Sequence, residues 1–462
     1  MVGPNYHRPA APTSIAYKEA AGWAPAQPSD AADRKDWWTV FNDPVLNALE
    51  AKVDVSNQTL AAAEAAYRQA TALVREDRAA LFPTISLTGS ATTSGGGGAA
   101  TIAGGAAGAP GGSTNSNTSY RVGVGGSWQP DLWGAIRRNI ESARASAQAS
   151  AGTLANARLS AQMELALDYI QVRELDEQKR ILDATDVAYA RNLTINQNKY
   201  NAGVSAKSDV LSALSQRASA QADEVDLAQQ RARFEHAIAI LAGEPPAALT
   251  LAPAPWNLKL PEIPPGVPSA LLQRRPDIAQ AERSAASANA LIGVQTAAYY
   301  PNLTLTGEGD LAASSLGRLF NASSFVWSVG ASVAETIFDA GARRARVAQA
   351  RAVYDQAVAN YRQTVLTAFG QVEDNLAAQR VLAGEQTLRQ TASNAANANE
   401  TITRNQYFAG QVDYTAVVVS QATALTARTT ELQIEALRLT TAVDLIAALG
   451  GGWTDTDLPR RP

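Results

Sequence analysis

The eight-residue stretch FPTISLTG, residues 82–89, occurs a second time in this chain as YPNLTLTG, residues 300–307. In the first copy Ile85 and Leu87 alternate with small or polar side chains. In the second copy Leu303 and Leu305 show the same alternation. A period of two predicts a short β-strand with one apolar face. The chain therefore carries two related strands far apart in sequence.

The match between the two copies extends beyond these strands. Residues 57–89 align without gaps with residues 275–307, and NKYNAG (198–203) matches NQYFAG (405–410). The spacing of the two matches differs because the first copy has a longer glycine-rich insertion, residues 95–112. Each copy predicts a helix, a strand, a loop, a strand, a very long helix, a tight turn and a helix.

A second strand is predicted in each copy. Residues 120–128 place Tyr120, Val122, Val124 and Trp128 on one face, and residues 325–333 show the same alternation. Short strands with one apolar face and one small or polar face, ending in aromatic residues, are typical of membrane β-barrels. An amphipathic hairpin on a soluble core would give the same pattern.

Two arguments favour the membrane interpretation. No other segment supplies a conventional core for such sheets, and four strands cannot close a barrel, although an open edge is not tolerated in lipid. Several copies of the chain must then contribute strands to one barrel. The residues expected to face lipid are Ile85, Leu87, Val122, Val124, Trp128, Leu303, Leu305, Trp327 and Val329.

Proline placement defines the helical zones. Residues 131–244 and 302–458 contain no proline, which would cost about 3 kcal/mol in a helix interior. Unbroken helices are predicted over 135–202 and 342–409, each roughly 100 Å long at ~1.5 Å per residue. Apolar and small residues recur in them at spacings of three and four, which indicates close, coiled-coil-like packing.

Two proline-rich segments lie outside these zones, at residues 4–44 and 245–276. Both are predicted to be extended linkers that lie over a helical surface. The chain is accordingly divided into five parts. They are an N-terminal extended and equatorial segment (1–45), a first repeat (46–245), a proline-rich linker (246–275), a second repeat (276–453) and a C-terminal tail (454–462).

Composition argues against catalysis and against nucleic-acid binding. The chain has no cysteine, which excludes disulfides and thiolate sites, and its net charge is only −4. His7 and His236, the two histidines, are far apart in sequence and lack partners at the spacing that a metal site needs. The glycine run 95–98 lacks the Gly-Lys-Ser/Thr of a phosphate loop, so a flexible extracellular loop is expected there. No enzyme activity, metal or cofactor is predicted.

Four motifs together resemble one family. They are VGPNY (2–6), WWTVFNDPVL (37–46), RRPDI (274–278) and DLWG (131–134), the last preceded by Trp128. The chain resembles the TolC-like outer-membrane factors, in the lipoprotein branch that serves resistance-nodulation-division efflux systems. The similarity covers nearly the whole chain.

The resemblance implies a mixed α and β membrane protein: a homotrimer with a twelve-stranded β-barrel in the outer membrane and a twelve-helix periplasmic α-barrel. It implies a passive exit duct for drugs or other small molecules in a Gram-negative bacterium, docked onto a periplasmic adaptor and a proton-driven inner-membrane pump. A lipidated cysteine is expected just before Val2. Alternatives are a duct for type I protein secretion, which the lipoprotein-like start disfavours, and a non-channel coiled-coil scaffold, which would have no use for the strands.

Two segments are predicted to be helical hairpin turns with a glycine C-cap, residues 200–210 and 407–418. The resemblance implies that these turns form the periplasmic aperture and the adaptor-docking surface. Without the resemblance they would be only two turns. The expected docking residues are Gly203, Val204, Ser205, Gly410, Gln411 and Val412.

The resemblance also places Asp209 and Tyr407 where relatives hydrogen-bond across neighbouring helices and hold the aperture shut. Val419 stands where many relatives carry an aspartate ring, and Asp413 is the only acid of the second turn. We therefore expect an uncharged constriction at Val419, together with an Asp209–Tyr407 bond. In the alternative, residues 417–419 pack between helices and never face the lumen.

Overall fold

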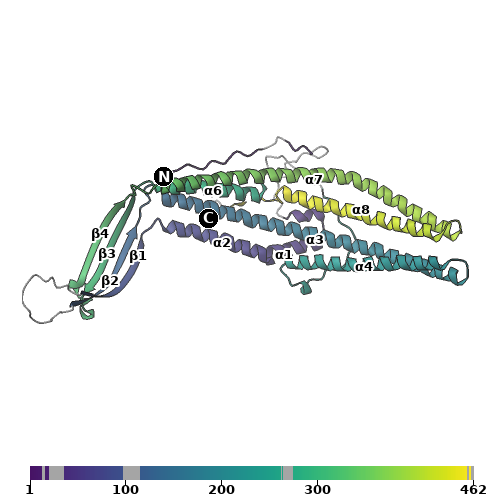
Figure 1. Cartoon of the computed structure of the whole chain (residues 1–462), viewed down its shortest axis with the longest axis horizontal. Helices are drawn as coiled ribbons and strands as arrows, with labels where there is room; N and C mark the ends of the chain where they lie inside the picture. The colour runs from purple at the N-terminus through teal and green to yellow at the C-terminus, as the bar shows by residue number, and fades with distance from the viewer. Residues whose placement is uncertain are drawn as a thin grey trace, which may run out of the picture.

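The computed structural model describes residues 1–12, 16–19, 36–96, 115–261, 263, 274–454 and 457–458. The molecule is elongated, with a four-stranded sheet at one end and long helices that extend from it to the opposite end (Figure 1). The N-terminus lies where the sheet meets the helices. None of the described helices combines the length and the hydropathy that a membrane-crossing helix needs.

The two repeats have matching elements. A 3-10 helix, η2 (Trp37–Phe41), and α1 (Pro44–Ser56) precede them, and the short 3-10 turns η3 (Pro246–Ala248), η5 (Leu316–Arg318) and η6 (Ala322–Ser324) lie in connections. The first repeat comprises α2 (Gln58–Ala79), β1 (Thr84–Gly96), β2 (Asn115–Trp128), α3 (Ala135–Asn201) and α4 (Lys207–Leu241). The second comprises α6 (Pro276–Ala297), β3 (Asn302–Ala313), β4 (Phe325–Ala334), α7 (Ala342–Phe408) and α8 (Tyr414–Ala448).

Corresponding helices have equal lengths: α2 and α6 have 22 residues, α3 and α7 have 67, and α4 and α8 have 35. The predicted duplication and the two very long helices are confirmed. Each long helix begins after a glycine in the left-handed region, Gly134 or Gly341, both with φ of 89°. Asp131 accepts hydrogen bonds from the backbone N–H groups of Ile136 and Arg137, which satisfies donors that a helix start leaves free.

The one glycine inside α3 marks a close helix approach. A Cβ atom on Gly152 would lie 3.1 Å from the carbonyl oxygen of Pro276, at the start of α6. Such a contact is tighter than side chains normally make, so glycine lets α6 lie against α3. The small residues of both helices continue this contact, and Ser287 of α6 hydrogen-bonds to Ser142 of α3 at 2.8 Å.

The four strands form one antiparallel sheet in the order β1-β2-β3-β4. Leu87 of β1 lies opposite Val124 of β2, which lies opposite Gly309 of β3, and Gly309 lies opposite Trp327 of β4. Directly opposed residues share a face, so the register sorts the side chains of all four strands into two sets. Within the described residues, β1 and β4 are the edges of the sheet and pair on one side only.

The first tryptophan-rich motif packs on the middle of α3. Trp37, Phe41 and Leu46 are buried in one apolar cluster with Tyr169 and Ile170 of α3. Asp43 caps α1 by accepting hydrogen bonds from the N–H groups of Val45 and Leu46. Its other carboxylate oxygen accepts a hydrogen bond from the Tyr169 hydroxyl at 2.7 Å. One aspartate thus both starts α1 and ties it to the long helix.

The described part of the N-terminal segment lies over the helices, as predicted. Arg138 of α3 donates to the carbonyl oxygens of Val2 and Gly3. The Tyr6 hydroxyl donates to Glu282 of α6 at 2.6 Å. The remaining parts of the predicted segments lie outside the described residues: 13–15 and 20–35 of the N-terminal segment, 262 and 264–273 of the linker, 455–456 and 459–462 of the tail, and 97–114 of the expected glycine-rich loop.

The core beneath α1 contains an acid that the sequence did not single out. The side chain of Glu50 is fully buried, and neither carboxylate oxygen has a hydrogen-bond partner among the described residues. Burial first, and then the nearby Asp54 carboxylate, raise the pKa of Glu50 to about 9. Glu50 is therefore neutral at pH 7 in the folded chain.

This burial predicts a pH-dependent stability. The folded chain keeps the Glu50 proton that the unfolded chain releases above its ordinary pKa of 4.5. The stabilisation that the Glu50 proton gives to the folded chain is fully present below that value. It is lost as the pH rises toward 9, and the free energy of unfolding falls by up to about 1.4 kcal/mol per pH unit. Glu50→Gln should flatten the fall in melting temperature between about pH 5 and about pH 8. The exposed Glu76→Gln is the control, and an unchanged slope in Glu50→Gln would contradict the assignment.

Candidate functional site

Two hairpin turns form the tip of the molecule farthest from the sheet (Figure 1). The first joins α3 to α4 and the second joins α7 to α8. Gly203 and Gly410 have φ of 74° and 73°, the left-handed geometry that glycine adopts without strain. The N–H groups of Val204 and Gln411 each donate back to a carbonyl in the last turn of the preceding helix. The predicted glycine-capped turns are confirmed as local structure.

Tyr407 lies at the centre of the tip. It packs in a buried cluster with Tyr414, Val417 and Ala213, which come from α8 and α4. The Lys199 ammonium nitrogen lies 3.8 Å from the centre of the Tyr407 ring. The Tyr407 hydroxyl donates to Oδ1 of Asn196 on α3 at 2.6 Å, and Asn196 is fully buried. One phenol therefore joins the two helical hairpins.

The predicted Asp209–Tyr407 bond is not formed within the described residues of the single chain. Within the described residues the Tyr407 hydroxyl is directed to Asn196, a buried neutral acceptor, while Asp209 is half-buried in the first turn of α4. Burial first, then Tyr407, Tyr189 and Asp209, raise the pKa of Tyr414 to about 12.

A second polar contact lies one helical turn above the first. Asn192 donates to Oε1 of Gln421 at 3.1 Å, and both side chains are buried. Asn192, Asn196 and Gln421 were not predicted from the sequence. The available signal was the four-residue spacing of the two asparagines, which places both amides on one face of α3. Buried amides at a helix contact need partners, so this face had to meet polar groups.

The three valines that follow the second turn point in different directions. Val417 is 1% exposed and packs in the tip cluster, and Val418 packs against the same cluster. Val419 is 60% exposed. Helices of the single chain therefore cover Val417 but leave Val419 open. Asp413 is exposed at the start of α8, and its side chain makes no capping hydrogen bond.

The six expected docking residues are not equally accessible. Gly203, Val204, Gly410 and Gln411 are exposed, with 74% of the Val204 side chain open. Ser205 is half-buried, and Val412 packs against the Tyr407 cluster. Four of the six are thus exposed in the single chain, and two are partly buried.

All nine residues expected to face lipid lie on one face of the sheet. The register aligns Ile85 with the row that contains Val329, and Leu305 lies opposite Trp128. The charged residues of the described strands, Arg121, Glu308 and Asp310, fall on the other face. Arg121 forms an ion pair with Asp310 at 3.1 Å between β2 and β3. The sheet therefore has one uncharged face and one polar face.

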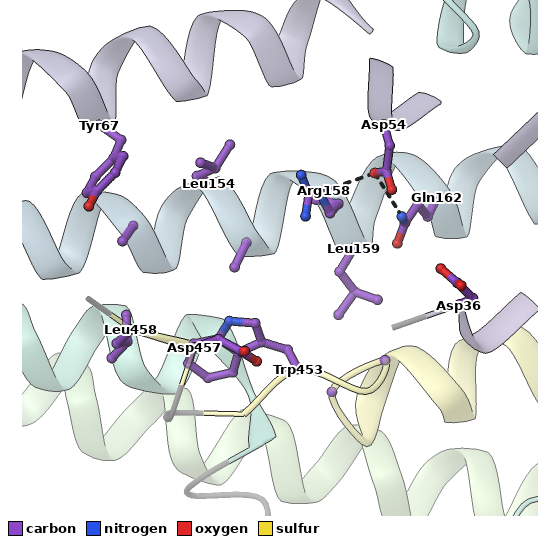
Figure 2. Close-up of a pocket in the computed structure, with 14 residues that line it drawn as sticks. Asp36, Asp54, Tyr67, Leu154, Arg158, Leu159, Gln162, Trp453, Asp457 and Leu458 are labelled. Atoms are coloured by element: carbon purple, nitrogen blue, oxygen red, sulfur yellow. Dashed lines mark hydrogen bonds and ion pairs between the residues drawn. The ribbon is translucent and has the colours of Figure 1, made fainter. Parts of the chain in front are cut away.

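A cavity of about 510 Å³ lies beside α3. Figure 2 shows that α2, α3 and the C-terminal segment line it, with Tyr67, Arg158 and Trp453 around it. Asp54 bridges Arg158 and Gln162 at its edge. None of the residues predicted for the aperture, the docking surface or the lipid face lines this cavity.

Known proteins share the sequence and the fold of this chain. Residues 51–244 and 267–451 match the family model of the outer membrane efflux protein. The chain belongs to the outer membrane efflux protein family. The pyoverdine export outer membrane protein OpmQ of Pseudomonas aeruginosa is 31% identical to this efflux protein over 426 residues, 92% of this chain and 89% of OpmQ.

Two further relatives of this efflux protein agree. The solvent efflux pump outer membrane protein SrpC of Pseudomonas putida is 28% identical over 98% of this chain and 95% of its own. The structure of the Campylobacter jejuni CmeC outer membrane channel has a TM-score of 0.89 and 25% identity, covering 98% of this chain and 96% of CmeC. The predicted family, the mixed α and β fold class, the outer-membrane location and the role as outer-membrane duct of a tripartite efflux pump are confirmed.

The corrected tip contact makes a prediction about channel opening. Tyr407→Phe and Asn196→Ala each break the bond between the two hairpins, a loss of about 1 kcal/mol or roughly fivefold in an equilibrium. Each should raise the open probability several-fold in single-channel recordings. Asp209→Asn is the matched control and should change it little. An effect of Asp209→Asn equal to that of Tyr407→Phe would restore the original pair.

Proposed function

We propose that three copies of this chain close a single twelve-stranded barrel and continue as one twelve-helix tunnel, a passive exit for small molecules. The observation that carries the proposal is the sheet itself, which has four strands, two unpaired edges and one uncharged face. In lipid such edges must be paired, and twelve strands are enough to enclose a pore. The chain performs no catalysis, and the pump supplies the energy.

The lower aperture is formed by the tips, with Val419 as an uncharged ring. Its exposure in the single chain supports this role, because the side chain has no cover within its own protomer. An apolar constriction can close a pore by dewetting. Asp413 lies six residues earlier, immediately before α8, and is exposed.

Single-channel recording in planar bilayers tests the duct and its aperture together. The purified protein should form conducting pores, and Val419→Asp should add a block by divalent cations from the periplasmic side. Val417→Asp is an unsuitable control because Val417 is buried. Thr415→Asp serves instead, because Thr415 lies four residues before Val419 and is exposed. Strong divalent block of the wild-type pore that survives Asp413→Ala would contradict an uncharged ring.

The uncharged face of the sheet contacts lipid, and the face with Arg121 and Asp310 lines the pore. Leu87→Arg places a charge against hydrocarbon, which should cost about 2–4 kcal/mol near the bilayer centre. Ser86→Arg, at the neighbouring residue on the polar face, is the matched control and should be tolerated. The amount of folded protein in outer-membrane fractions measures the effect of both substitutions. An equal loss of folded protein in the two variants would reject the assignment of the lipid-facing side.

The exposed tip residues, with Val204 foremost, contact a periplasmic adaptor, which links the duct to a proton-driven pump of the inner membrane. Affinity capture of the native protein after cross-linking tests this, and the proteins that co-purify should be an adaptor and a proton-driven exporter. Capture of an ATP-driven protein exporter instead would favour type I secretion. Capture of neither, from cells in which the pore conducts, would remove the pump from the proposal.

A further inference from the structure

The second repeat carries a cavity between two of its helices, close to their junction with the sheet. This cavity, of about 480 Å³, lies between α6 and α7. Arg346 of α7 is the one charged residue among the described residues that line it, and Gln295 and Gln349 add two amides. Arg346 is exposed, and no carboxylate of the described residues forms an ion pair with it. The cavity therefore has a positive charge that its lining does not balance.

The first repeat shows how the same position is otherwise filled. Equal helix lengths align α6 with α2 and α7 with α3 residue by residue, so Gln295 corresponds to Asp77 and Arg346 to Asn139. Asn139 donates to Oδ1 of Asp77 at 2.7 Å, which joins α2 to α3 at this level. In the second repeat the acid is replaced by a neutral amide and the amide by a cation. The two copies thus differ in one respect that matters for binding, an arginine without an acid.

The cavity has a polar end and an apolar end. Because α6 leads into β3 and α7 leads away from β4, Gln295 and Arg346 lie at the end nearest the sheet. Leu291 and Val353 line the cavity roughly 6–10 Å farther from the sheet along the helix axes. An anion with an apolar body matches both ends. A phospholipid of the proposed membrane would be reversed, because its acyl chains extend from the headgroup toward the bilayer centre.

The cavity and the N-terminal segment lie on opposite sides of α6. The N-terminal segment contacts Glu282, Asn289 and Gly293, which share one face because seven and four residues separate them. Leu291 and Gln295 each follow a member of this face by two residues, which turns them to the other side of the helix. In the proposed tunnel the N-terminal segment covers the outer surface, since three such segments inside would fill the passage. The cavity then opens toward the interior.

We infer that this cavity binds small organic anions with an apolar body, such as carboxylates or sulfonates, as they pass along the duct. The inference rests on the proposed function, because it assigns a substrate class to the same passage. The Arg346 guanidinium donates to the acid group, and the amides of Gln295 and Gln349 supply further donors. Leu291 and Val353 contact the apolar body.

Calorimetric titration of the purified protein in a nonionic detergent tests the site, with naphthalene sulfonate as the probe. The wild-type protein should bind this anion. Arg346→Gln should weaken binding about tenfold or more, because a hydrogen bond to a charged donor is lost. Gln295→Asp should weaken it as much, because the new carboxylate pairs with Arg346. Arg344→Gln is the matched control and should leave binding unchanged, since Arg344 is exposed and does not line the cavity.

Two further probes separate the charge from the apolar body. Naphthylmethylammonium keeps the rings and carries a cation, and inorganic sulfate keeps the negative charge without the rings. Both should bind more weakly than naphthalene sulfonate. Equal binding of either probe, or no binding of naphthalene sulfonate to the wild-type protein, would overturn the site.

Single-channel recording tests the position of the site within the duct. Naphthalene sulfonate should reduce the current through the wild-type pore and have less effect on Gln295→Asp. A conducting wild-type pore whose current this anion leaves unchanged would overturn the site while the proposed duct remains. Purified protein that forms no pore would instead overturn the proposed function itself.

Discussion

The unpaired edges of β1 and β4 are the constraint on which the rest of this structure depends. The sheet exposes an uncharged face that includes Ile85, Leu87, Trp327 and Val329, each more than two-thirds exposed in the single chain. A backbone N–H or C=O left without a partner in hydrocarbon costs several kcal/mol, so an open sheet cannot remain in a membrane. Either the edges meet another copy or the sheet does not enter lipid.

The long helices follow from the same duplication. Each strand pair continues into a 67-residue helix, which carries the order set by the sheet down to the tips. Small side chains let the helices approach closely, as Gly152 does against Pro276. The middle of the molecule is tied by Asp43 and Tyr169, and the far end by Tyr407 and Asn196. A few buried hydrogen bonds therefore fix the spacing of helices whose apolar contacts are individually small.

Much of this architecture could be predicted from sequence because its boundaries are marked by backbone chemistry. The predicted helices, 135–202 and 342–409, end within one residue of those observed, since Gly203 and Gly410 stop them sharply. The strand faces follow from alternation alone. The partners of buried polar groups did not follow, because Asn196 and Asp209 lie on either side of the first hairpin turn, far from Tyr407 in sequence, and only packing decides between them. Glu50 was missed for a related reason: an acid on a short helix reads as solvent-exposed until the helix that covers it is known.

The different burial of the three valines at 417–419 could not be predicted from the sequence either. Three identical side chains give no signal of direction, and the phase of α8 alone buries Val417 and exposes Val419. What lies beyond the chain, in the neighbouring copies, decides whether that exposed valine faces the pore.

The number of copies in the particle tests the central claim most directly. Native mass spectrometry of the protein released from detergent should give three copies of the chain and no stable smaller species. A stable, folded monomer would contradict the claim, because four strands with two open edges would then persist without a partner.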